Sequence, residues 1–228
     1  MTTLGLIAEP AARTEPQRVT TIRDPAVGAA VSRVNSVHDE QIQALVQQLF
    51  FGHDPTPVRH VGFSAVESQT ETAQLCLDVA TALAATGSCD VGLIDVQLQS
   101  DALHTQLQIP AGNRAEPSWL IAPRLWLTPR RSWLSDSPQR NWDSSLAQLR
   151  AATLEFDFSI LCLDPVSWLT AKLSQTCNGL VMVLTANKTR RLVAAQLQEQ
   201  LRRAGVPLLG TVLADRRFPV PTGLYRNL

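Results

Sequence analysis

The strongest constraint on the fold is a series of short, almost wholly apolar segments separated by stretches with helical periodicity. The clearest are 91–95 (Val-Gly-Leu-Ile-Asp), 156–163 and 179–185 (Gly-Leu-Val-Met-Val-Leu-Thr). A half-exposed strand alternates polar and apolar residues, whereas a strand covered on both faces does not. The sequence therefore predicts buried parallel strands in an α/β fold.

Further strands are predicted at 58–65 and 208–213, with a short one at 125–127. The predicted helices, in which apolar residues recur every three or four positions, are 39–50, 72–85, 142–152 and 189–204. Residues 66–71 are predicted to be a polar loop. Short links between strand, helix and strand favour βαβ units, so we expect a mainly parallel sheet with helices on both faces, a three-layer sandwich.

The first part of the chain is different. Residues 1–36 contain Pro, Thr, Arg and Glu without periodicity, so they cannot bury enough apolar surface to offset the entropy of ordering. We expect a flexible N-terminal tail at 1–36 and one α/β domain at 37–228. A chain of 228 residues with 45% hydrophobic and 18% charged residues fits this division.

Charge, hydropathy and cysteine spacing exclude several classes of protein. Twenty Lys and Arg balance twenty Asp and Glu, so no nucleic-acid partner is expected. No segment approaches the roughly 18 apolar residues of a membrane span, so we expect a cytoplasmic protein without direct membrane insertion. Cys76, Cys89, Cys162 and Cys177 form no C-x-x-C pair, which indicates reduced thiols.

Segment 62–72 (Gly-Phe-Ser-Ala-Val-Glu-Ser-Gln-Thr-Glu-Thr) resembles the strand, P-loop and helix of the capsular and exopolysaccharide tyrosine autokinases. These bacterial kinases, the BY-kinases, are related to the Min and Par ATPases, and their loop runs Ser-Ala-x-Pro-Gly-Glu-Gly-Lys-Thr. Further matches follow in the family's order at 93–98, 103–104, 156–161, 187–191, 209–213 and 218–226. The resemblance covers about residues 38–228 and implies a P-loop NTPase-like domain.

The phosphate-binding positions depart from the family's pattern. A phosphate loop needs glycines, whose backbone N–H groups surround the phosphates, and a lysine that reaches the β and γ oxygens. The corresponding positions are Ser68, Gln69, Thr70, Glu71 and Thr72. Ser68 and Thr70 replace glycines, and Glu71 replaces the lysine. At ~4 Å a carboxylate repels a phosphate by a few kcal/mol at intermediate dielectric, which predicts a degenerate loop.

The metal side is partly retained. The resemblance implies that the hydroxyl of Thr72 would hold Mg²⁺ and that Asp95 would position metal or water, although Thr72 also suits a helix N-terminus and Asp95 a turn cap. The family's next aspartate falls at Cys162, and Asp164, two residues on, shares its strand face. Asp95 and Asp164 are therefore the catalytic candidates, and Thr72 and Asp95 the metal candidates. Asp164 also suits the turn before Pro165.

Other family features are reduced. Gln97 stands where the family has a second aspartate, and Ala214 where it has the asparagine that reads adenine. Glu40 alone remains of the oligomerising pattern Glu-x-x-Arg-x-x-Arg, and Tyr225 alone of the tyrosine cluster. The basic group 188–191 opens a predicted helix, where it either binds an anion or forms a solvated face.

Together these substitutions predict a degenerate, non-catalytic regulatory or interaction module of exopolysaccharide or capsule biosynthesis and export, with no cofactor. The resemblance implies a partner, the cytoplasmic part of a membrane polysaccharide chain-length regulator or export protein, which would hold the chain at the inner face of the membrane. The enzymatic alternative is a divergent, active ATPase or tyrosine kinase that binds Mg-ATP through Thr72, Asp95 and Asp164. A third possibility is an α/β scaffold without a ligand.

Overall fold

The computed structural model describes residues 36–52, 57–67, 69–98, 103, 106–107, 118–134 and 141–214, of which 36–37 and 69–71 are described by their backbone alone. The predicted tail lies outside the described residues except for Ser36, at which the first helix begins. Tyr225 and the family match at 218–226 also lie outside them.

Seven strands form one sheet in the order β3-β4-β2-β5-β1-β6-β7. They are β1 (His60–Ala65), β2 (Val91–Val96), β3 (Trp119–Ala122), β4 (Leu125–Thr128), β5 (Phe158–Leu163), β6 (Gly179–Thr185) and β7 (Leu208–Ala214). All neighbouring strands are parallel except β3 and β4, which form an antiparallel hairpin at one edge. The predicted mainly parallel sheet is confirmed.

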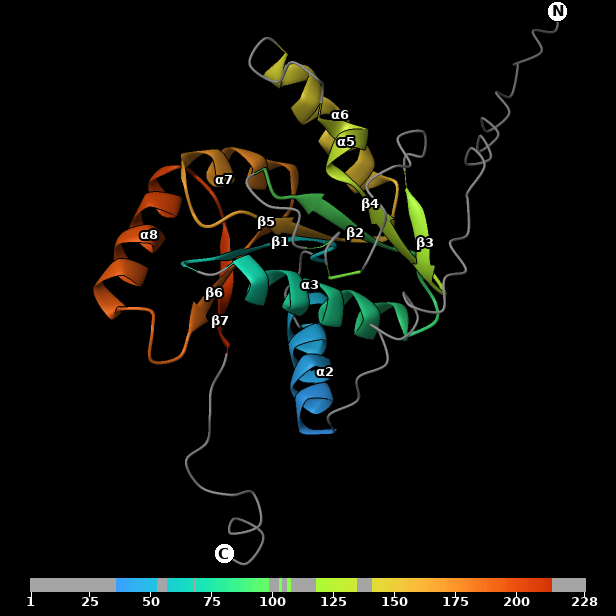
Figure 1. The fold of residues 1–228 in the computed structure, drawn as a ribbon, viewed down its shortest axis with the longest axis horizontal. Coiled ribbons are helices and arrows are strands. Elements are labelled where there is room, and N and C mark those ends of the chain that lie inside the picture. The colour runs from blue at the N-terminus through green and yellow to red at the C-terminus, as the bar shows by residue number, and fades with distance from the viewer. Residues whose placement is uncertain are drawn as a thin grey trace, which may run out of the picture.

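Helices cover both faces of the sheet (Figure 1). On one face lie α2 (Ser36–Phe50) and α3 (Gln69–Ala84); on the other lie α5 (Arg130–Trp133), α6 (Trp142–Leu154), α7 (Trp168–Leu173) and α8 (Arg191–Arg203). A short 3₁₀ turn, Ser174–Thr176, follows α7. The three-layer α/β class is confirmed. None of the helices in the described ranges is long and apolar enough to cross a membrane.

The sheet separates two apolar cores. Val61, Phe63 and Leu93 belong to the core under α2 and α3. Ile94 and Leu161 belong to the core under α5 to α8. Neighbouring residues of one strand thus enter different cores, because successive side chains point to opposite faces. Both faces of the central strands are therefore buried against apolar side chains, which explains their uniformly apolar sequences.

One predicted boundary is wrong in a way that affects the site. The polar loop predicted at 66–71 is shorter, because α3 begins at Gln69 rather than at Thr72. Residues 69–71 therefore form its first turn. Segment 66–72 contains no glycine, and Gln and Glu are good helix formers, so helical backbone extends toward β1.

Several short elements were not predicted. These are β3, α5, α7 and the 3₁₀ turn, each of which has three to six residues. Segments of this length are too short to show a helical or strand period. In the hairpin, Arg124 turns the chain with a φ of 59° between β3 and β4, although arginine is not a typical left-handed residue.

Candidate functional site

The candidate site lies where the parallel strands end. In a doubly wound sheet, ligands bind beyond the carboxyl ends of the strands, since the loops that leave them converge there. Asp95 lies near the end of β2, Asp164 directly follows β5, and α3 begins shortly after β1. The structure thus brings all three predicted segments to one edge of the sheet.

Cys162 lies at the centre of this edge. It is fully buried and stands opposite Asp95 in the parallel register of β2 and β5. A hydrogen bond with the thiol of Cys76 on α3, together with burial and the negative charges of Asp95 and Asp164, raises the pKa of Cys162 well above its ordinary value. The thiol is therefore protonated at neutral pH, and a protonated thiol is a poor ligand for Mg²⁺, which binds oxygen.

Asp95 supports the turn that follows β2. Its side chain is fully buried, and Oδ1 accepts a hydrogen bond of 3.1 Å from the backbone N–H of Gln97. Its backbone carbonyl accepts from the indole Nε1 of the buried Trp133 at 2.9 Å. This contact with Gln97 is the one expected if Asp95 caps the turn.

Asp164 supports the same turn from the neighbouring strand. Oδ2 of this buried residue accepts from the backbone N–H of Leu98 at 2.7 Å. Its backbone carbonyl accepts from the hydroxyl of Ser64 on β1 at 2.6 Å. The two predicted catalytic aspartates therefore hold consecutive N–H groups, those of Gln97 and Leu98. Sequence reasoning placed Asp164 in the turn before Pro165 or at a metal, and missed its contact with Leu98.

The predicted phosphate-loop residues are only partly described. Ser68 lies outside the described residues, while Gln69, Thr70 and Glu71 contribute backbone to the first turn of α3. Thr72, the predicted metal ligand, is fully buried within α3. The structure therefore places Thr72 on the helix that also carries Cys76.

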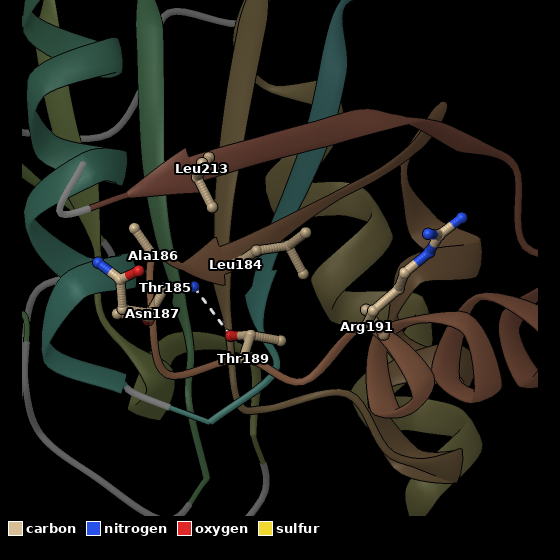
Figure 2. A pocket seen from close by; sticks show the side chains of 8 residues that line it. Leu184, Thr185, Ala186, Asn187, Thr189, Arg191 and Leu213 are labelled. Carbon is tan, nitrogen blue, oxygen red and sulfur yellow. Dashed lines mark hydrogen bonds between the residues drawn. The ribbon is translucent and has the colours of Figure 1, made fainter. Parts of the chain in front are cut away.

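A hollow lies between the ends of β6 and β7 and the start of α8 (Figure 2). It has a volume of about 440 Å³, and its lining includes Leu184, Asn187, Arg191 and Leu213. Here the hydroxyl of Thr189 accepts a hydrogen bond of 2.9 Å from the backbone N–H of Thr185. Of the three cations in the basic group 188–191, Arg191 is the one that lines this hollow.

Comparison with known proteins identifies the architecture. No protein-family model matches the chain, and no curated protein matches it in sequence. The kinase domain of the Escherichia coli tyrosine kinase ETK superposes with a TM-score of 0.66 at 17% identity, over 92% of this chain and 89% of that one. The chimerical protein CapA2B2 superposes with a TM-score of 0.67 at 15% identity, over 85% and 91%. This chain has a BY-kinase-like P-loop ATPase fold.

The same fold extends to a ParA family ATPase from Chlorobium tepidum TLS, with a TM-score of 0.50 at 16% identity over 68% of this chain and 73% of that one. Identities this low establish the fold and leave the activity to the residues of the site.

The residues of this P-loop-like fold fit its usual ligand, Mg-ATP, poorly. A protonated thiol, that of Cys162, lies opposite Asp95 and close enough to Asp164 for the charge of that residue to raise its pKa. Both aspartates hold backbone N–H groups of the turn after β2. Among the described residues, no group of three or more His, Cys, Asp or Glu side chains is arranged to hold a metal ion.

Gln97 adds a feature that sequence reasoning missed. It is fully buried, and neither Oε1 nor Nε2 of its side-chain amide has a hydrogen-bond partner within the described ranges. A buried polar group without a hydrogen-bond partner lowers the stability of the fold by about 1–3 kcal/mol. Its place directly after a buried strand was the available signal, but the sequence could not show that the amide is enclosed.

Proposed function

We propose that this chain is a P-loop-fold domain that has lost Mg-ATP turnover and acts as a binding or regulatory module. The observation that carries this proposal is the protonated, buried thiol of Cys162 opposite Asp95. At this position an oxygen ligand would help to orient hydrated Mg²⁺, and a neutral thiol supplies no charge for that purpose.

The phosphate side supports the same proposal. Catalysis of phosphoryl transfer depends on positioned positive charge and backbone donors around the transferred group. Glu71 in place of lysine reverses the charge, and Ser68 and Thr70 in place of glycine restrict the backbone. The start of α3 at Gln69 leaves a shorter loop before the helix.

For the biological setting we propose exopolysaccharide or capsule biosynthesis and export. Support comes from the resemblance to the polysaccharide autokinases and from the fold shared with tyrosine kinase domains. The proposed partner is the cytoplasmic part of a membrane chain-length regulator or export protein, which would hold this chain at the inner face of the membrane.

A divergent active ATPase or tyrosine kinase is the second candidate. It is favoured by one observation, that Thr72, Asp95 and Asp164 are all buried near the carboxyl ends of β1, β2 and β5. In an active enzyme each of these carboxylates would serve metal or water while it also accepts from the N–H group of Gln97 or Leu98.

An ATP hydrolysis assay separates the two candidates. The purified chain, incubated with Mg-ATP, is expected to release phosphate at the rate of the buffer alone, and Asp95→Ala is expected to change nothing. Hydrolysis that Asp95→Ala abolishes, while the variant keeps its native circular dichroism spectrum, would establish the active candidate instead.

A further inference from the structure

A cleft lies on the sheet face opposite to Cys162, between α5, α6 and α7, and encloses about 710 Å³. Leu98, Leu134, Trp142 and Leu169 form its apolar wall, and they pack against the core under α5 to α8. Cys162 belongs to the other core. The cleft thus lies on the other face of the sheet from Cys162, and it shares Leu98 with the turn that Asp95 and Asp164 hold. Its volume and lining are typical of a binding site.

Trp168 stands at the rim of this cleft with 78% of its surface exposed. Its position at the start of α7 is fixed: the hydroxyl of Ser167 accepts from the N–H of Thr170 at 3.2 Å, and the hydroxyl of Thr170 donates to the carbonyl of Pro165 at 2.9 Å. Exposed tryptophan is uncommon in proteins, and tryptophan is enriched where proteins contact one another. An exposed indole on a capped helix start, beside an apolar wall, indicates a contact surface.

The charges on the cleft have one sign. Arg130 and Lys172 line it, and among the described residues no acidic side chain does. Nη1 of Arg130 donates to the carbonyl of Gln97 at 2.7 Å, which fixes this cation at the wall. An occupant with carboxylate oxygens would complement these charges.

We propose that this tryptophan cleft binds an acidic segment of a partner protein. An apolar side chain of the segment lies against Trp142 and Trp168, and flanking carboxylates lie beside Arg130 and Lys172. A polypeptide suits the cleft better than a small molecule, because the exposed rim at Trp168 is covered only by a ligand that continues beyond the cleft. The inference rests on the proposed role as a binding module.

Two capped synthetic peptides test it, both with a central Phe-Leu pair, one flanked by Asp and Glu and the other by Lys. Titrated into the full chain by calorimetry, the acidic peptide is expected to bind at least about tenfold more tightly than the basic one. Trp168→Ala and Lys172→Glu should each weaken the binding of the acidic peptide about tenfold. Added salt should also weaken the binding of this peptide to the wild type.

The matched controls lie on and beside α8. Leu192→Ala changes a side chain that is also 78% exposed, and Arg190→Glu reverses an exposed charge. Both should leave the affinity within about twofold, as expected for sites outside the contact. Equal affinity for the two peptides, no binding at about 1 mM, or equal losses in the control variants would overturn the proposal.

Phenyl phosphate, titrated in parallel, represents a small aromatic anion. Binding of phenyl phosphate that depends on Trp168, without binding of the acidic peptide, would overturn the proposal in favour of a small-molecule site. The peptide titration and the hydrolysis assay test different proposals. ATP turnover would contradict the proposed loss of catalysis and not the peptide-binding cleft. Absence of peptide binding, in a chain that also shows no turnover, would contradict only the proposal that the tryptophan cleft binds an acidic segment.

Discussion

Cys162 on β5 faces Asp95 on β2 across a parallel strand pair, and the carboxylate of Asp95 is one of the charges that raise the pKa of this thiol. Because both groups are buried, the negative charge of Asp95 makes ionisation of the Cys162 thiol unfavourable. A neutral thiol places no third negative charge beside Asp95 and Asp164.

Restoring the acid should therefore destabilise the fold. Cys162→Asp buries an unpaired carboxylate beside two others, and we expect it to lower the free energy of unfolding by roughly 3–5 kcal/mol at pH 8. Burial and the neighbouring charges raise the pKa of the new carboxyl in the folded state, so the loss should grow as pH rises above about 4. Urea unfolding at pH 5 and pH 8 measures this.

Cys162→Ser is the control, because it keeps the size of the side chain without a charge. Its effect should be smaller and nearly the same at the two pH values. A Cys162→Asp variant as stable as the wild type at pH 8 would contradict this description of the surroundings of Cys162.

For Asp164 we expect a structural role. Asp164→Ala removes the acceptor for the N–H of Leu98 and should cost about 1–3 kcal/mol in urea unfolding, whereas Asp164→Asn keeps an acceptor and should cost less. Millimolar Mn²⁺ should not raise the melting temperature of the wild type. Stabilisation by Mn²⁺ that Asp164→Asn removes would show instead that this carboxylate is a metal ligand.

The close approach of the Phe156 ring to Gly92 on β2 gives a third prediction. A Cβ on Gly92 would overlap the ring of Phe156, whereas a Cβ on Gly210 meets nothing within 4 Å. Gly92→Ala should therefore destabilise the domain by roughly 1–3 kcal/mol through overpacking. Gly210→Ala, the matched control in β7, should be neutral or slightly stabilising. Equal melting temperatures for the two variants would contradict the close contact of the Phe156 ring with β2.

The thiol of Cys177 gives a prediction about alkaline pH. Burial raises its pKa to about 11, although hydrogen bonds with the backbone of Gly179, Gly62 and Cys177 itself partly oppose this. Between about pH 9 and pH 11 the unfolded chain loses this proton and the folded chain keeps it, so stability should fall by up to about 1.4 kcal/mol per pH unit. Cys177→Ser should show a shallower fall in urea unfolding; identical slopes for both proteins would contradict the raised pKa.

Much of the fold was predictable because the central strands are buried on both faces. Segments 91–95 and 179–185 correspond closely to β2 and β6, and the uniform apolar sequence follows directly from two covering layers. The start of α3 was harder, since the expectation of a loop at 66–71 rested on the polarity of these residues. The sequence had already lost the glycines that would keep such a loop from becoming helix.

The site was less predictable than the fold for a different reason. Sequence reasoning identified Asp95 and Asp164, but their partners are backbone N–H groups of Gln97 and Leu98, and a backbone group leaves no signature in the sequence. The contact of Cys162 with Cys76 joins residues far apart in the chain. The cleft at Trp168 depends on α7, a helix of six residues that no periodicity could predict.

Calorimetric titration with a non-hydrolysable Mg-ATP analogue tests the central claim most directly. We expect no saturable binding to the wild type up to about 1 mM analogue, because a carboxylate at Glu71 would repel the phosphates and the glycines are absent. The double variant Thr70→Gly with Glu71→Lys should gain affinity by at least about tenfold. Saturable micromolar binding to the wild type, lost on Asp95→Ala, would contradict the account and show that the nucleotide site is intact.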